Sequence, residues 1–238
     1  MATSKASTAC LVGSTGLVGS HILTTLAAHP EISSVYAYTR RDNLPATTSV
    51  KPASSPKVRY ISNIDTSAWH SQYPSNARVF FSALGTTARR AGSFANQRKI
   101  DYDLNVALAQ AAKNAGATVY VLISTSGASV SSIWPYSRMK GELDEAVKKI
   151  GFEHTIILKP GLLVGMREDS RPGEFAARTV AGALGKVSGG WLTDGWAQDA
   201  DVVARAAVVA GLQAVAGESK KGSRELGQKE IVRLGRQT

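Results

Sequence analysis

The stretch Gly13-Ser14-Thr15-Gly16-Leu17-Val18-Gly19 constrains the fold of this 238-residue chain more than any other part of the sequence. An apolar run at 8–12 precedes it, and residues 17–28 have the apolar spacing of a helix until Pro30 interrupts the pattern. Glycines at this spacing permit a tight turn, close approach of a pyrophosphate and packing of the helix on a sheet. The sequence therefore predicts a dinucleotide-binding loop that includes Gly19.

Strand-like and helix-like segments alternate after this loop. Strands are expected at 35–39, 58–61, 78–84, 118–124 and 155–158, and helices at 66–72, 102–115 and 137–150. Near-continuous apolar strands that alternate with helices are typical of a parallel sheet covered on both faces. We predict an α/β fold, a Rossmann-type doubly wound parallel sheet, in a single domain of residues 1–238. Its core is expected at about 8–161 and a small C-terminal helical and loop cap at about 162–238.

The charge and cysteine content exclude several classes of protein. The net charge is +10, but the basic residues are scattered in short pairs without interleaved aromatic residues, which argues against a nucleic-acid partner. The single cysteine, Cys10, lies in an apolar run, so we expect it to pack in the core and to form no internal disulfide. The four histidines are widely spaced, and we predict no metal site.

The sequence also limits how the chain could meet a membrane. No apolar stretch approaches the ~18 residues needed to cross a bilayer. The glycine loop begins so early that we expect no room for an Arg-rich mitochondrial presequence ahead of the fold.

The end of the second expected strand indicates which dinucleotide binds. NAD-selective sites usually have an acid there that binds the ribose 2′-hydroxyl, whereas this strand is followed by Arg40 and Arg41. A guanidinium can pair with a 2′-phosphate through two hydrogen bonds, so we predict NADP, with NAD as the less favoured cofactor. Asp42 follows directly and could bind the 2′-hydroxyl instead.

A candidate catalytic group follows the fifth expected strand. Tyr136 and Lys140 are four residues apart and therefore lie on one face of a helix. An ammonium beside the phenol lowers its pKa, which suits Tyr136 to exchange a proton with a carbonyl or alcohol. The hydroxyls of Ser124, Thr125 and Ser126, at the end of the strand, could hydrogen-bond a substrate oxygen.

These elements together resemble the short-chain dehydrogenase/reductase superfamily. Four segments, 11–19, 81–87, 135–142 and 194–199, resemble an atypical branch of it, the fungal mitochondrial outer-membrane proteins related to the Tat-interacting oxidoreductase-like proteins. The similarity extends over about residues 9–236. It implies an oxidoreductase that moves a hydride between a nicotinamide and a carbonyl or alcohol, and with the Arg40-Arg41 pair we expect the cofactor to be NADP(H).

The resemblance also implies roles for individual residues. It assigns the pyrophosphate to Gly13, Ser14, Thr15, Gly16, Leu17 and Val18, the adenosine ribose to Arg40 and Arg41, the middle of the cofactor to Leu84, Gly85 and Thr86, and the nicotinamide to Pro160 and Gly161. Tyr136 is the implied proton donor, and Lys140 is implied to bind the nicotinamide ribose and to tune Tyr136. Thr125 is the implied triad hydroxyl, although the superfamily usually has Ser there, and Ser126 is the alternative.

The substrate is not indicated by these motifs. Arg167 and Arg171 are candidates for contacts with an acidic substrate, and Trp134, Trp191 and Trp196 for an apolar pocket; a solvated loop and packing of the cap are the respective alternatives. The resemblance places the protein on the cytosolic face of the mitochondrial outer membrane as a peripheral protein; otherwise we expect it in the cytoplasm. The alternative function is a catalytically weak or inactive NADPH-binding regulatory or scaffold protein there.

Overall fold

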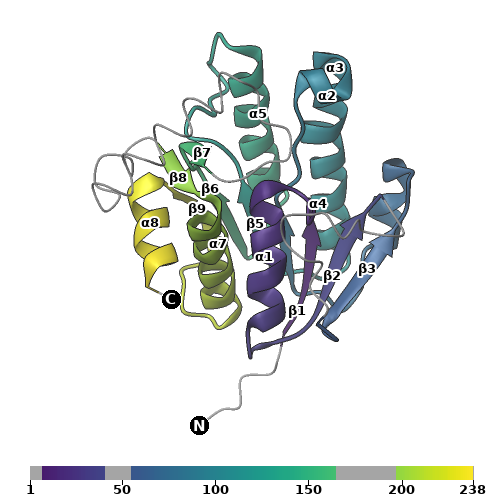
Figure 1. The fold of residues 1–238 in the computed structure, drawn as a ribbon, viewed down its shortest axis with the longest axis vertical. Coiled ribbons are helices and arrows are strands. Elements are labelled where there is room, and N and C mark those ends of the chain that lie inside the picture. The colour runs from purple at the N-terminus through teal and green to yellow at the C-terminus, as the bar shows by residue number, and fades with distance from the viewer. Residues whose placement is uncertain (1–6, 41–54, 165–196, 238) are drawn as a thin grey trace.

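A seven-stranded parallel sheet forms the centre of the fold (Figure 1). The computed structural model describes residues 7–40, 55–164 and 197–237. The strand order is β3-β2-β1-β4-β5-β6-β9. Their bounds are β1 Ser7–Val12, β2 Ile32–Thr39, β3 Val58–Ser62, β4 Val79–Ser82, β5 Val119–Ile123, β6 His154–Leu158 and β9 Gly222–Leu226. A separate parallel pair consists of β7 (Leu162–Val164) and β8 (Ala197–Asp199).

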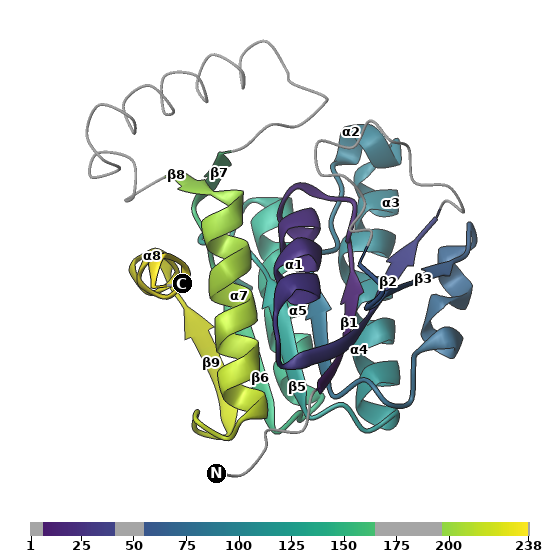
Figure 2. The ribbon, with the colours of Figure 1, turned by 60° about the horizontal axis from the view of Figure 1, so that its bottom comes forward.

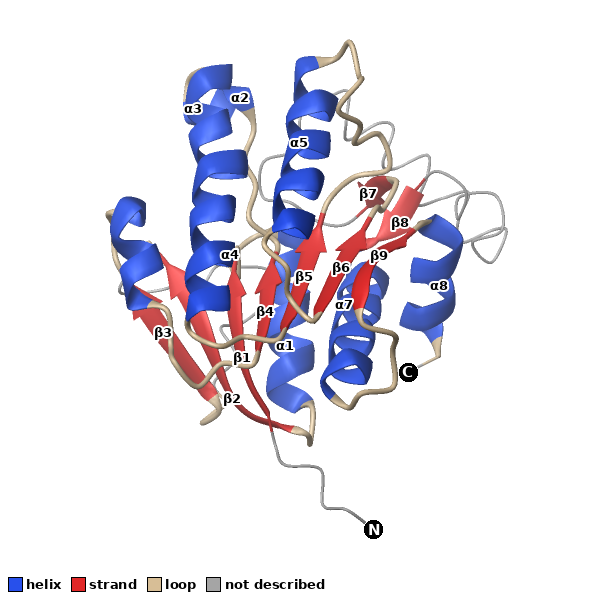
Figure 3. Cartoon of the chain, turned by 180° about the vertical axis from the view of Figure 1, so that it is seen from behind, coloured by secondary structure: helices blue, strands red, loops and turns tan. Residues whose placement is uncertain are grey.

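Helices cover both faces of the sheet. On one face, α1 (Leu17–Ala28) packs beside α7 (Ala200–Val215), and α8 (Gln228–Arg236) packs on α7 (Figure 2). The opposite face carries α4 (Asn105–Asn114), α5 (Pro135–Lys149) and the 3-10 helix η1 (Thr66–Gln72) (Figure 3). The predicted Rossmann-type doubly wound sheet is confirmed.

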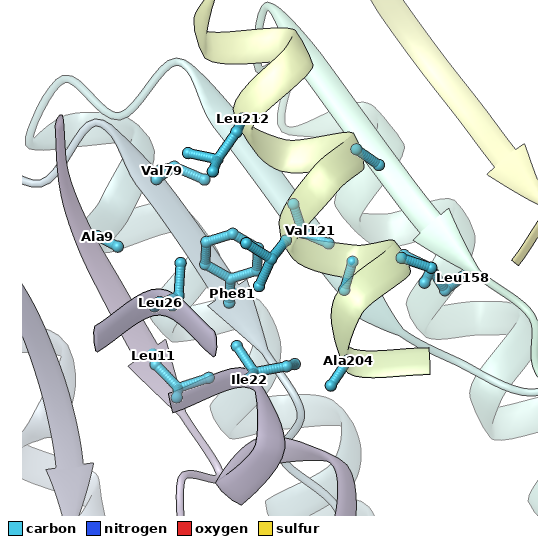
Figure 4. Close-up of a cluster of buried hydrophobic side chains, with 14 of the residues drawn as sticks. Ala9, Leu11, Ile22, Leu26, Val79, Phe81, Val121, Leu158, Ala204 and Leu212 are labelled. Atoms are coloured by element: carbon cyan, nitrogen blue, oxygen red, sulfur yellow. The ribbon is translucent and has the colours of Figure 1, made fainter. Parts of the chain in front are cut away.

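The hydrophobic core consists of two clusters, one between the sheet and the helices on each face, because successive strand residues point to opposite faces. In β1, Ala9 and Leu11 face α1 and α7, whereas Cys10 and Val12 face α4 and α5. Figure 4 shows the first cluster, with Phe81 of β4 at its centre. Full burial of a side chain such as Phe81 contributes about 2 kcal/mol to stability.

The helix expected at 102–115 begins further upstream than its apolar pattern indicates. Ser93 is the N-cap, and its hydroxyl accepts a hydrogen bond from the Asn96 N–H at 3.1 Å. Helical backbone then runs through α3 (Phe94–Arg98) and the π-helical turn η2 (Lys99–Leu104) into α4. A short helix α2 (Ala88–Ala91) precedes them.

The core also extends beyond its predicted limit at residue 161. β9 pairs in parallel with β6, from His154 opposite Gly222 to Leu158 opposite Leu226, and so closes the sheet. Leu226 and the α8 residues Ile231 and Leu234 are buried in the first cluster. Residues 200–236 therefore belong to the layers of the core, which corrects the boundary drawn between core and cap.

Candidate functional site

The loops that follow β1, β4, β5 and β6 all leave the sheet at its carboxyl edge because the strands are parallel. The strand order changes direction between β1 and β4, and ligands of open α/β sheets bind outside such a switch point. The topology therefore brings the glycine loop (residues 13–19), the 84–86 loop, the β5–α5 loop (residues 124–134) and Pro160-Gly161 to one edge.

The glycine loop needs glycine at its two ends. Gly13 has φ +82°, and a Cβ at this position would lie 2.4 Å from the carbonyl oxygen of Ala83. A Cβ on Gly19 would lie 2.0 Å from the carbonyl oxygen of Gly13. The Gly16 N–H donates to the Gly13 carbonyl at 2.9 Å. The loop is thus folded tightly between β4 and the first turn of α1.

The N-terminus of α1 is open to an anion. Gly16 is its N-cap, no side chain caps the helix, and its first turn contains no acidic residue. The first N–H groups of a helix have no partner within the helix, and together with the positive end of the helix dipole they favour negative charge. Ser14 anchors the loop, since its hydroxyl donates to the carbonyl of Tyr38 in β2 at 3.0 Å. These features fit a pyrophosphate, and side chains added at Gly13 or Gly19 would destroy the loop.

Arg40 follows β2, the strand beside β1, and its side chain is exposed at the same edge as the glycine loop. This placement suits contact with an adenosine ribose. Arg41 and Asp42 lie outside the described residues, as do Arg167, Arg171, Trp191 and Trp196. The choice between NADP and NAD stays a prediction.

Side chains of the helical segment that contains η2 form hydrogen bonds with the backbone of the 84–86 loop. The Thr86 N–H donates to Asp101 Oδ1 at 2.7 Å, and Gln97 Nε2 donates to the Thr86 carbonyl at 3.0 Å. Asn105 Nδ2 lies 3.5 Å from the Leu84 carbonyl and 3.0 Å from that of Asp101. Isolated π-helical turns occur frequently at functional sites. This one carries Asp101, and the helices before and after it carry Gln97 and Asn105.

Tyr136 and Lys140 occupy the first two turns of α5, as predicted. Pro135 starts the helix, where its missing N–H costs no hydrogen bond. Tyr136 is 44% exposed and Lys140 only 3% exposed. The β5–α5 loop packs on this helix, because a Cβ on Gly141 would lie 2.3 Å from the Ser129 carbonyl carbon. The helix therefore directs a buried ammonium and an accessible phenol to the same end of the sheet.

The candidate triad hydroxyls follow β5, where backbone hydrogen bonds still join the chain to the residues that end and follow β6. The Ser124 N–H donates to the Leu158 carbonyl at 2.8 Å, and the Ser126 N–H donates to the Pro160 carbonyl at 2.9 Å. Ser126 thus lies beside the predicted nicotinamide contact. Thr125 is half-buried and Ser126 is exposed, so both hydroxyls remain candidates.

Two buried carboxylates act on Lys140. Burial lowers the pKa of its ammonium, and the negative charges of Asp101 and Asp144 act to raise it. Burial raises the pKa of Asp144, which the Ser124 hydroxyl and the Lys159 ammonium, 3.4 Å away, act to lower. Lys159 also pairs with Glu225 of β9 at 2.8 Å. A network of charged side chains therefore extends from Lys140 to β9, the outermost strand of the sheet.

The sequence analysis missed several of these side chains. Asp144 follows Lys140 by one helical turn, and this spacing of four was a visible signal. Asp101, Gln97 and Asn105 gave no comparable signal, because each has its partners in the 84–86 loop, which precedes the helix.

Two kinds of feature are absent from the described parts of the chain. No helix among them is both long and apolar enough to cross a membrane. Within the same residues there is no group of three or more side chains that could hold a metal ion. Trp134, which directly precedes α5, is 70% exposed beside Tyr136.

Comparisons with known proteins agree with this arrangement. The family model described as HIM1 matches residues 57–185. The protein fmp52-1, mitochondrial, of Aspergillus terreus is 51% identical over 95% of this chain and 98% of its own length. A UDP-N-acetylglucosamine 4-epimerase from Methanobrevibacter ruminantium superposes with a TM-score of 0.70 at 14% identity, covering 94% of this chain and 76% of the epimerase. The Bordetella bronchiseptica enzyme WbmH in complex with NAD+ gives 0.62 at 16%, covering 92% and 75%.

Proposed function

The chain belongs to the HIM1 family and is a homologue of the fungal Fmp52 proteins, and from this premise we propose that it is an NADP(H)-binding oxidoreductase of the short-chain dehydrogenase type. Its substrate would be a carbonyl compound or an alcohol. One observation carries the proposal: the glycine loop at the uncapped N-terminus of α1, and an exposed Tyr136 one helical turn before a buried Lys140, lie at the carboxyl ends of the strands of a Rossmann-type sheet.

The cofactor would lie along this edge. The N-terminus of α1 and the glycine loop would hold the pyrophosphate, and the 84–86 loop would contact the middle of the molecule. Arg40, together with Arg41, would bind a 2′-phosphate and so favour NADP over NAD. A bound nicotinamide would supply or accept a hydride. The enzyme WbmH, a neighbour in fold, was solved with NAD+, which supports a nicotinamide cofactor without deciding between the two forms.

Side chains of this protein would then transfer the proton that accompanies the hydride. Tyr136 Oη would donate a proton to a carbonyl oxygen, or accept one from an alcohol. Lys140 would stabilise the phenolate electrostatically and bind the nicotinamide ribose. Thr125 or Ser126 would hydrogen-bond the same substrate oxygen and orient it. Pro160, hydrogen-bonded to the Ser126 N–H, would keep the nicotinamide contact beside that hydroxyl.

The test uses purified full-length protein. We expect NADPH to raise the melting temperature more than NADH does. In a panel of carbonyl substrates, Tyr136→Phe should lower turnover by about 100-fold or more, since a general acid is lost, and should leave the NADPH-induced shift unchanged. Tyr60→Phe, at a similarly exposed tyrosine on β3, is the matched control and should alter neither quantity.

Two results would contradict the proposal. Turnover that is unaffected by Tyr136→Phe excludes the proton-transfer role. A melting temperature that responds to neither nucleotide excludes cofactor binding altogether.

A second candidate function is a catalytically weak or inactive NADPH-binding regulatory or scaffold protein. The observation in its favour is the triad hydroxyl: a half-buried Thr125 and an exposed Ser126 stand where the superfamily usually has a serine. This function predicts a strong NADPH-dependent thermal shift without NADPH oxidation by any carbonyl in the panel.

The cellular site belongs to the same proposal. Relationship to fungal mitochondrial proteins is supported by the name of the Aspergillus terreus relative. We place the protein peripherally on the cytosolic face of the mitochondrial outer membrane. Release by alkaline carbonate and digestion by protease added to intact mitochondria would support this location, and protection from the protease would contradict it.

A further inference from the structure

Asp101 joins two parts of the candidate site that are distant in sequence. Its side chain is 1% exposed and lies on the π-helical turn η2. Oδ1 accepts the Thr86 N–H at 2.7 Å, and Oδ2 lies 3.5 Å from Gln97 Nε2, which itself binds the Thr86 carbonyl. A Cβ added to Gly85 would lie 3.7 Å from Oδ2. One buried carboxylate therefore bonds the Thr86 end of the 84–86 loop and lies close to Gly85.

The same carboxylate acts on Lys140. η2 packs against α5, and Arg98 pairs with Glu142 across this interface at 2.6 Å. Asp101 and Lys140 are both almost fully buried there. The Lys140 ammonium acts to lower the pKa of Asp101, and Asp101 in turn acts to raise that of Lys140. A buried ammonium needs such a partner, because isolated charges are costly to remove from water.

Other charged groups near Lys140 come from its own helix and from β6. Asp144 follows it by one turn of α5, and the Lys159 ammonium lies 3.4 Å from that carboxylate. Tyr136 precedes it by one turn. Asp101 is thus the carboxylate that η2 presents to Lys140, and it differs from Asp144 in also binding the 84–86 loop.

We propose that Asp101 is a positioning residue that couples the 84–86 loop to the catalytic Lys140. Its Oδ1 fixes the loop through the Thr86 N–H, and its negative charge keeps Lys140 protonated and in place. The inference rests on the proposed function, because it assigns Lys140 to the cofactor ribose and to Tyr136. Asn at this position keeps an oxygen that can accept the Thr86 hydrogen bond but removes the charge.

The first experiment needs no cofactor. Lysines labelled with ¹³C at Cε are titrated by NMR in the wild type, Asp101→Asn and Asp103→Asn, and the signal missing in Lys140→Met identifies Lys140. We expect Asp101→Asn to reduce the affinity of Lys140 for its proton by about tenfold. Asp103 lies on the same turn with an exposed side chain, so Asp103→Asn should leave the Lys140 titration unchanged.

A reciprocal titration covers the case in which Asp101→Asn does not fold. The Asp101 carboxyl, labelled with ¹³C, is followed in the wild type and in Lys140→Met, where the Thr86 hydrogen bond is preserved. Loss of the ammonium should raise the pKa of Asp101, because interacting sites shift each other reciprocally. Unchanged titration of Lys140 in Asp101→Asn, or of Asp101 in Lys140→Met, overturns the proposal.

The second experiment measures NADPH binding as a function of pH. In Asp101→Asn, Lys140 loses its proton at a lower pH, so affinity should decline earlier as the pH rises and match the wild type at the acidic end. In the Lys140→Met background, Asp101→Asn should have no further pH-dependent effect. An equal loss of affinity at every pH would indicate a purely structural role and overturn the proposal.

If the wild type binds neither nucleotide, the proposed function fails, and the NMR titrations still decide the Asp101–Lys140 coupling.

Discussion

Gly19 illustrates at the scale of a single residue why the glycine loop tolerates little change. Its missing Cβ leaves space for the carbonyl of Gly13, and a Cβ there would come within 2.0 Å. We expect Gly19→Ala to destabilise the protein by about 1–3 kcal/mol, because either the loop or the start of α1 must move. NADPH binding should be lost even in the fraction that folds. Urea unfolding and nucleotide titration measure the two effects.

Gly227 provides the control for this substitution. It lies at the N-terminus of another helix, α8, where it is the N-cap; a Cβ added there meets nothing within 4 Å, and its φ is −80°. Gly227→Ala should therefore change neither stability nor NADPH binding by a comparable amount. Normal cofactor affinity in Gly19→Ala would show that the close approach to Gly13 is not needed for the site.

The residues of the site differ in how visible they are in the sequence. The glycine loop and the Tyr136–Lys140 pair could be predicted because each depends on spacing within one short segment. Asp101 and Asn105 could not, because their roles depend on backbone groups of the 84–86 loop that the fold brings to them. Hydroxyls at 125 and 126 were predicted together, and the structure places both at the edge without choosing between them.

At the scale of elements, the π-helical turn η2 is stabilised by one side chain that satisfies groups on two segments. Asn105 Nδ2 approaches the carbonyls of Ile100, Asp101 and Leu84, and its Oδ1 accepts the Ser82 hydroxyl at 2.5 Å. Asn105→Ala leaves these buried groups unpaired, and we expect a loss of about 2 kcal/mol in the free energy of unfolding. Hydrogen exchange at the Thr86 amide should also increase.

Asn114, at the other end of the same helix, tests whether this cost depends on position. Its side chain accepts a hydrogen bond from the exposed side chain of Gln110, at 2.9 Å. Asn114→Ala should change stability by no more than about 0.5 kcal/mol. Equal effects of the two alanine substitutions would argue against a special role for the π-helical turn.

Strand β9 was missed by the sequence analysis for a physical reason. The inner strands are buried on both faces and are therefore apolar, whereas Gly222–Leu226 lies at the edge of the sheet and contains Ser223, Arg224 and Glu225. Only Leu226 is fully buried. An apolar periodicity cannot identify such a strand, because its place depends on pairing with β6.

At the scale of the whole molecule, ion pairs join this last strand to the layers that carry the candidate site. Glu225 lies 2.8 Å from Lys148 of α5 and 2.8 Å from Lys159 at the end of β6. Hydrogen bonds from Lys148 and then Lys159 hold the pKa of Glu225 below its ordinary value of 4.5. The charged form is thus favoured by folding, although the side chain is 40% exposed and solvent screens much of the interaction.

The sign of the pH dependence follows from this lowered pKa. A carboxyl group whose pKa is lower in the folded state stabilises the fold above its unfolded pKa, and this contribution disappears as the pH falls through the folded pKa. We expect Glu225→Gln to cost about 0.5–1 kcal/mol near pH 7 and progressively less as the pH falls below 4.5 and through the folded pKa of Glu225. Urea unfolding of both proteins across this acidic range measures the difference. Glu218→Gln, at an exposed carboxylate before β9, should show no such convergence. A gap between wild type and Glu225→Gln that stays constant down to the acidic end would mean that Glu225 contributes packing instead of charge. The attachment of β9 would then depend on packing and on its pairing with β6, and not on these ion pairs.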